Sequence, residues 1–117
     1  MTWFERFQVP QEPGFRVLAG RDNGLTRLLL ASGRMAADDH GAVHLHAGDE
    51  VLRVLSGELL VRIGDERRRC REGDIAIMPP NTWHGFRAVT DTVIEVIAEE
   101  HHVRDGKQYR PAQPGPR

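Results

Sequence analysis

The sequence predicts an all-β fold, either a sandwich or a closed barrel of short strands. Short apolar runs recur roughly every eight to twelve residues, with Gly, Asp, Asn or Pro between them, which is the spacing of strands in such folds. Helix signals are nearly absent. Ser56-Gly57 and Gly64-Asp65 are hairpin-turn dipeptides, because glycine adopts the positive φ that tight turns require. A small β domain must protect its sheet edges, so we expect closure into a barrel or jelly roll, or edge pairing across a dimer.

Several segments have the composition and length of strands. In chain order they are residues 15–19, 25–31, 42–46, 50–56, 58–63, 67–71, 74–79, 84–89 and 92–99. The run that begins at residue 74 stops at "MPPN", because consecutive prolines remove backbone donors and cannot continue a central strand. We therefore expect a turn there, followed by a new strand that begins at His84.

The chain of 117 residues is long enough for one domain with its own core and too short for two. We expect an N-terminal arm with edge strands (1–24), a barrel (25–100), and a polar, proline-rich tail (101–117) that is flexible or lies on a partner. The segment "TWFERF" (2–7) alternates and is rich in aromatic residues. We expect it to add to a sheet, either its own or that of a neighbouring subunit.

Charge and composition exclude several classes of function. The net charge of -1 argues against nucleic-acid binding, which requires a basic excess. The basic run "RRRCR" (67–71) is balanced by nearby acidic residues, and we interpret it as the solvated face of a strand. No apolar run is long enough to cross a membrane, and the N-terminus has no apolar signal-peptide core, so we expect a cytoplasmic protein. Cys70 is the only cysteine, which excludes an intrachain disulfide.

The stretch "VHLHAGDEV" (43–51) carries the strongest functional signal. Residues i and i+2 of a strand point to the same face, so His44 and His46 project together, and Glu50 opens the next strand close by. His84, which follows the Pro-Pro-Asn turn, is the candidate for a fourth ligand. Three imidazoles and a carboxylate suit a divalent Fe, Mn, Ni, Co or Zn ion.

The same residues also allow a plainer interpretation. His-x-His with a nearby Glu occurs by chance on polar loops, and the argument for a metal depends on the addition of His84 behind its own turn. The other histidines lack this context, because His40 lies in a loop and His101 and His102 follow the last strand. We expect these three to be surface residues.

The two motifs resemble those of the cupins. "HLHAGDEVLRVLSG" places His44, His46, Glu50 and Gly57 at the spacing of the first cupin motif, and "GDIAIMPPNTWHGFRA" supplies Gly73, Pro79 and His84 of the second. The resemblance covers about residues 25–99. Where the family has glycine before the first histidine, glycine after the proline and a final asparagine, this sequence has Asp38, Asn81 and Ala88, and none of these is a ligand position.

The resemblance implies a jelly-roll barrel (a double-stranded β-helix) that holds a divalent metal through His44, His46, Glu50 and His84. It also implies a homodimer and a small-molecule substrate, with dioxygenase the most common chemistry of such proteins. A non-redox isomerase, cyclase or lyase remains an alternative, in which Glu50 would act as a base as well as a ligand. A further alternative is a non-catalytic barrel that binds a small molecule or a metal.

The pocket around this site is predicted from strand parity. Parity with Glu50 turns Leu52 and Val54 inward, and parity with His84 turns Phe86 inward. Met78 and Trp83 flank the turn that delivers His84 and are candidates for the pocket mouth. All five are also ordinary core residue types. Because polar groups other than the ligands are few, an apolar or aromatic substrate that chelates through oxygen is the modest inference.

Overall fold

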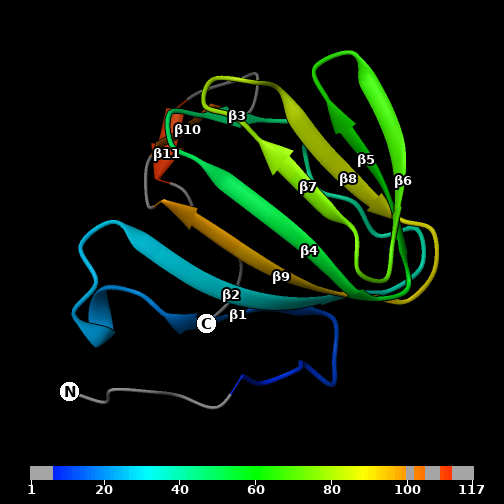
Figure 1. Cartoon of the computed structure of the whole chain (residues 1–117), viewed down its shortest axis with the longest axis horizontal. Helices are drawn as coiled ribbons and strands as arrows, with labels where there is room; N and C mark the ends of the chain where they lie inside the picture. The colour runs from blue at the N-terminus through cyan, green and yellow to red at the C-terminus, as the bar shows by residue number, and fades with distance from the viewer. Residues whose placement is uncertain (1–6, 100–101, 105–108, 112–117) are drawn as a thin grey trace.

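The computed structural model describes residues 7–99, 102–104 and 109–111, and nearly all of its regular structure is β (Figure 1). The strands, in chain order, are β1 (Gly14–Ala19), β2 (Leu28–Met35), β3 (Leu45–His46), β4 (Glu50–Ser56), β5 (Glu58–Ile63), β6 (Glu66–Arg71), β7 (Ile75–Met78), β8 (His84–Ala88), β9 (Thr92–Glu99), β10 (His102–Arg104) and β11 (Tyr109–Pro111). One short 3-10 helix, η1 (Arg21–Asn23), precedes β2. The all-β prediction is confirmed.

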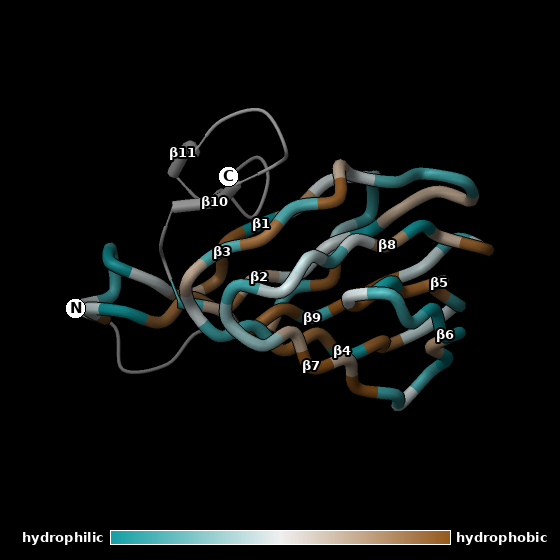
Figure 2. Tube along the Cα trace, turned by 90° about the horizontal axis from the view of Figure 1, so that it is seen from above, coloured by the Kyte–Doolittle hydropathy of each residue, from teal (hydrophilic) through white to brown (hydrophobic). Residues whose placement is uncertain are grey.

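Two antiparallel sheets enclose the core. The larger has the strand order β1-β2-β9-β4-β7, and the smaller has the order β6-β5-β8. Inward-facing residues of both sheets form one buried cluster, which consists of Leu29, Ala31, Met35, Leu52, Val54, Leu59, Val61, Cys70, Ala76, Met78, Ala88, Ile94, Val96 and Ala98. The alternation of apolar and polar residues along each strand, visible as colour changes in Figure 2, is the pattern expected of a two-sheet jelly roll.

Strand β2 differs most from its predicted bounds of 25–31. Gly24 adopts φ 88° after η1, and the amide of Leu25 donates to the carbonyl of Gly20, so this part of the chain is a turn. The strand then continues to Met35, paired with β9 along its whole length. Glycine at position 33 makes this extension possible, because a side chain there would collide with the ring of Phe15.

The predicted strand 42–46 is much shorter in the structure. Only Leu45 and His46 form a strand, β3, and His44 instead makes an isolated antiparallel bridge to His84. The chain thus passes from one sheet to another between His44 and Leu45. This crossing sets the positions of both histidines.

The two ends of the chain were predicted less accurately than the barrel. The tail 101–117 was expected to be flexible or to lie on a partner, but within it β10 and β11 form a hairpin, and β10 pairs with β3. The sequence did not predict this pairing, because β3 is a sheet edge and the strand that pairs with it comes from a distant part of the chain. At the other end β1 is the outermost strand of the five-stranded sheet. Residues 2–6 of the "TWFERF" segment lie outside the described residues.

Within the described part of the chain, no helix has the length and apolar character needed to span a membrane.

Candidate metal centre

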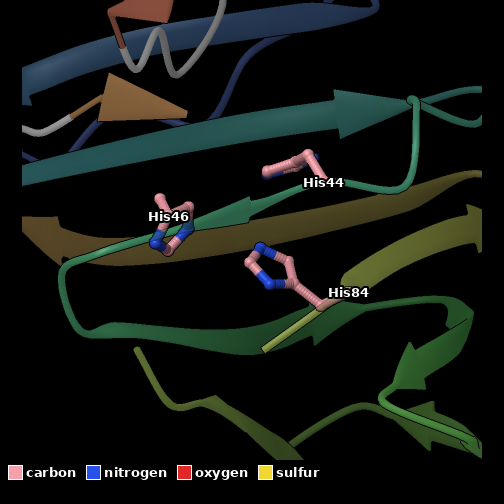
Figure 3. A group of neighbouring side chains, drawn as sticks. All are labelled: His44, His46 and His84. Atoms are coloured by element: carbon pink, nitrogen blue, oxygen red, sulfur yellow. The ribbon is translucent and has the colours of Figure 1, made fainter. Parts of the chain in front are cut away.

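Three histidines from two segments of the chain meet between the two sheets. His44 precedes β3, His46 lies within β3, and His84 is the first residue of β8. Their ligand nitrogens all lie within 4.8 Å of one another (Figure 3). His46 and His84 are 2% and 1% exposed, so these two rings are removed from water, whereas His44 is half-buried.

Main-chain hydrogen bonds hold these two segments together. The amide of His44 donates to the carbonyl of His84 over 2.9 Å, and the amide of His84 donates back to His44 over 2.8 Å. The carbonyl of His46 accepts a bond of 2.7 Å from the amide of Asn81. Asn81 has φ 58°, a left-handed conformation that asparagine tolerates better than most residues. The turn that delivers His84 is therefore fastened to His46 as well.

Each imidazole makes the same kind of contact through Nδ1. Backbone carbonyls lie 2.9 Å from His44 Nδ1 (Ala42), 3.1 Å from His46 Nδ1 (Gly48) and 3.0 Å from His84 Nδ1 (Thr82). A carbonyl oxygen can only accept, so Nδ1 carries the proton in every ring. In a neutral imidazole this leaves the lone pair on Nε2, the tautomer that metal-binding histidines adopt when a backbone carbonyl orients them.

The Nε2 atom of His84 is buried and has no hydrogen-bond partner. Such an atom normally costs free energy, because water has been removed and nothing has replaced it. The ring of His84 lies with its centroid 4.5 Å from that of His44 and 4.7 Å from that of His46. The Nε2 of His44 is an acceptor in the same tautomer, and the Nε2 of His46 faces Glu50, so neither ring supplies a donor to His84. A shared cation fits this arrangement.

Glu50, the first residue of β4, adjoins the group through His46. Its Oε1 lies 2.9 Å from His46 Nε2. Without a metal ion, this contact needs a proton between the two atoms, and a bound cation would replace that proton. Two neighbouring ligand atoms bound at right angles to one ion, each about 2.1 Å from it, are themselves about 3 Å apart. The structure thus gathers the three predicted histidines and places the predicted carboxylate in contact with one of them.

The electrostatics favour the protonation states that metal binding needs. Burial lowers the pKa of His84 below its ordinary value of 6.5, which keeps this ring neutral near pH 7. For Glu50, burial alone would raise the pKa, but the hydrogen bond with His46 and the nearby histidine charges outweigh it and lower the pKa below 4.5. A neutral imidazole and an ionised carboxylate are both metal-binding forms.

The candidate pocket residues take up two kinds of position. Leu52, Val54 and Met78 are fully buried members of the core, on the same face of the sheet as Glu50. Phe86 is partly buried against that core, and Trp83 is half-buried, with its carbonyl accepting a bond from the amide of Gly64. That these five residues line a substrate pocket stays a prediction.

The remaining histidines are His40, His101 and His102. His40 is exposed and bridges Arg87. His102 begins β10, and His101 is not among the described residues.

The carbonyls of Ala42, Gly48 and Thr82, which orient the three rings, were not foreseen from the sequence. Every residue has a carbonyl, so the residue type does not reveal which one will accept a hydrogen bond from an imidazole.

The comparisons with known proteins agree with this geometry. The family model of the cupin domain matches residues 33–98. No curated protein matches the chain.

Solved structures share the fold at low sequence identity. KdgF from Halomonas sp. is 23% identical with a TM-score of 0.67, covering 80% of this chain and 86% of its own. An RmlC-like cupin from Shewanella frigidimarina is 20% identical with a TM-score of 0.68, covering 84% and 87%. A mutant of salicylate 1,2-dioxygenase from Pseudoaminobacter salicylatoxidans is 18% identical with a TM-score of 0.66, covering 73% of this chain but 26% of that one. With its jelly-roll sheets, its histidines at the motif positions and a family match over more than half its length, the chain belongs to the cupin family.

Proposed function

We propose that this cupin is a metal-dependent enzyme that acts on a small organic molecule, with dioxygenase-type chemistry as the first candidate. The observation that carries the proposal is the buried, partnerless Nε2 of His84, which lies beside two further imidazoles of the same tautomer. A buried acceptor without a donor is a poor element of a structural core, and converging imidazoles of this tautomer make a good cation site.

His44, His46 and His84 would hold the ion, with Glu50 as the fourth ligand. This set of nitrogen and oxygen donors suits divalent Fe, Mn, Ni, Co or Zn. When bound, such an ion supplies a Lewis acid with open positions, and a redox-active one also supplies electrons for reaction with dioxygen. The chain's own contribution is to fix the tautomer of each ring through the three backbone carbonyls and to exclude water from the buried rings.

The interior indicates what kind of substrate would fit. Among the described residues, the buried polar side chains are those of Ser32, His46, His84 and Thr92. Ser32 donates to the carbonyl of Gln8, and Thr92 donates to the carbonyl of Glu58, so neither hydroxyl proton is available to a ligand. A substrate would therefore meet apolar walls, and its polar contacts would be made at the metal ligands. We propose a compact, largely apolar molecule that chelates through one or two oxygens.

Metal analysis combined with oxygen uptake tests the proposal. Protein purified without added metal is expected to retain a divalent ion, and His84→Ala is expected to lose it while keeping a β-rich circular dichroism spectrum. His40→Ala is the matched control, because His40 is exposed and lies outside the site. The Fe(II)-loaded protein is then assayed for oxygen consumption with diketones, catechols and thiols. Equal metal content in wild type and His84→Ala would remove the metal site from consideration.

Glu50 favours a second candidate, a non-redox isomerase, cyclase or lyase. Its carboxylate stays ionised close to the three histidines and would accept a proton from a substrate bound beside it. Turnover that proceeds without oxygen on a Zn- or Mn-loaded protein, and that Glu50→Gln abolishes while metal is retained, would establish this alternative over the dioxygenase. Tight binding of a small molecule with no turnover under either condition would identify a non-catalytic binding protein.

A further inference from the structure

The three-stranded sheet β6-β5-β8 has an outer face that takes no part in the core or in the metal centre (Figure 1). Leu59 and Val61 of β5 are buried, so the residues on either side of them along the strand point outward. The ladder register places the outward residues of β6 and β8 beside those of β5. The outward residues are Glu58, Leu60 and Arg62 of β5, Arg67, Arg69 and Arg71 of β6, and Arg87 of β8. We call them the arginine face.

Glu58 supplies the single carboxylate of the arginine face, and two of the arginines hold it. Arg71 Nε donates to Glu58 Oε1 over 2.7 Å, and Arg69 Nη1 donates to Glu58 Oε2 over 3.0 Å. The hydrogen bond from Arg71, together with the charge of Arg69, holds the pKa of Glu58 below its ordinary value of 4.5. One end of the face therefore binds a carboxylate with a pair of guanidinium groups.

The other end of the arginine face carries positive charge without a counterpart. Arg62 and Arg67 stand directly opposite each other in the ladder of β5 and β6, and like charges at opposite positions of a ladder repel. Arg87 lies in the next row, opposite Leu60. Among the residues that the structure describes, no carboxylate lies at ion-pair distance from any of these three arginines. A bound anion would remove the repulsion.

Two acidic residues that adjoin the basic run in the sequence contact other groups. Glu66 pairs with Arg68 over 3.3 Å, and both alternate with Arg67 along β6, so they lie on the opposite side of the sheet. Asp74 accepts a 2.8 Å hydrogen bond from the main-chain amide of Arg71, at the end of the face that Glu58 occupies. The chain as a whole has a net charge of -1, so the positive charge of the arginine face is a local excess.

Protection of a sheet edge does not account for all of these charges. Strand β6 ends its sheet, and charged side chains on such an edge discourage pairing with other chains. That role needs only the arginines of β6. Arg62 lies on the central strand, which is already paired on both sides, so its charge protects no edge.

The chemistry of the arginine face favours a polypeptide partner with carboxylates. Guanidinium groups form paired hydrogen bonds with carboxylates and with phosphates. Proteins that bind single-stranded nucleic acids add aromatic side chains on which the bases stack, and the arginine face contains no Phe, Tyr or Trp. Leu60, half-buried between Arg69 and Arg87, instead offers an apolar contact at the centre of the face. An acidic peptide with an apolar residue among its carboxylates matches both features.

We propose that the arginine face is a docking surface for an acidic segment of another protein. Carboxylates of that segment contact Arg62, Arg67 and Arg87, in the way that Glu58 is held at the other end, and an apolar side chain of the segment packs on Leu60. The metal centre lies on the inner side of the sheet, so the docked segment does not contact it. The inference does not depend on the proposed enzymatic function.

Fluorescence anisotropy with a labelled acidic peptide and the full chain tests the proposal. The probe is a peptide of about ten residues in which glutamates flank a central leucine, long enough to cross the three strands. The same peptide with Gln in place of every Glu is the uncharged control. We expect the protein to bind the Glu peptide and not the Gln peptide. The affinity should fall about tenfold or more between low salt and about 0.5 M NaCl, because salt screens exposed charges.

Charge-reversal variants locate the contact. Arg67→Glu and Arg87→Glu are each expected to weaken binding of the Glu peptide about fivefold or more, because each removes an attraction and adds a repulsion. Arg27→Glu is the matched control, since it makes the same change of charge at an exposed residue just before β2. Circular dichroism and metal content verify that each variant is folded with its metal centre intact.

Three results would overturn the proposal. The first is a wild type that does not bind the Glu peptide even at low salt, or that binds the Gln peptide equally well. The second is a pair of folded Arg67→Glu and Arg87→Glu variants that both bind as the wild type does. The third is tighter binding of a labelled single-stranded oligonucleotide, lost in both variants, which would assign the arginine face to nucleic acid instead.

Discussion

The stability order of wild type and His84→Leu is expected to reverse between metal-free and metal-loaded protein. In metal-free protein, the buried Nε2 of His84 has no partner, and an unsatisfied buried acceptor costs about 1–3 kcal/mol. Leucine removes this cost and fills a similar volume, but it loses the Nδ1 bond to the carbonyl of Thr82, a contribution of about 0.5–1.5 kcal/mol. Thr82 is only half-buried, so water can replace the lost donor.

The balance places the free energy of unfolding of metal-free His84→Leu between about 0.5 kcal/mol below and about 2.5 kcal/mol above the wild-type value, with a midpoint about 1 kcal/mol above it. With metal present the order changes. A ligand at about 100 times its dissociation constant stabilises the native state by about 2.7 kcal/mol, and only the wild type keeps the complete ligand set. The variant should therefore be at least as stable as the wild type in chelator and the less stable protein in excess metal.

Urea unfolding followed by circular dichroism measures both values, once in chelator and once in excess Zn(II). His40→Leu is the control, and we expect it to respond to metal as the wild type does. If metal-free His84→Leu is less stable than the wild type by more than about 0.5 kcal/mol, Nε2 is satisfied in solution and the reasoning fails. It also fails if metal stabilises the variant and the wild type equally.

Three more predictions concern acid, the C-terminal hairpin and a tight turn. The pKa of His84 in the folded state lies below 6.5, so the unfolded state binds the proton first as the pH falls. The free energy of unfolding of metal-free protein should therefore decrease from about pH 6.5 downward. Unfolding measured at several pH values should show a shallower decrease for His84→Leu. Deleting residues 100–117 removes the strand that pairs with β3. Calorimetry should then show a metal affinity about 10- to 100-fold weaker than that of the full chain. An unchanged affinity would mean that β3 needs no support from this strand. Gly57→Ala should lower the free energy of unfolding by more than about 1 kcal/mol, because Gly57 has φ 87° and a methyl group would meet the carbonyl of Asp91. Gly64→Ala is the control and should lower the free energy of unfolding less, because the space beside Gly64 is open.

The barrel could be predicted well from the sequence because its signals are local. Alternation along β4, β5 and β9 and the glycines of the hairpin turns specify strands with little reference to the rest of the chain. The errors occur where a distant partner decides the structure. Strand β2 extends to Met35 because β9 pairs with it throughout, and β10 forms because β3 offers an edge.

The candidate site likewise has features that local sequence patterns predict and features that they do not. Spacing and parity predicted that His44 and His46 would project together and that a turn would deliver His84. The common tautomer, the missing partner of the His84 Nε2 and the contact of Glu50 with His46 depend on ångström-scale positions. No residue pattern encodes them, since a carbonyl such as that of Thr82 can orient a ring whatever its side chain.

The hydrogen bonds that join the segments of His44, His46 and His84 to one another are made by main-chain atoms. The framework is therefore largely independent of the side chains that it presents. Aspartate, glutamine or cysteine at any of these positions would project from an almost unchanged backbone toward the same point. This barrel is thus a suitable starting point for exchanging one coordinating group at a time, so that the selectivity for different metals can be compared at constant geometry.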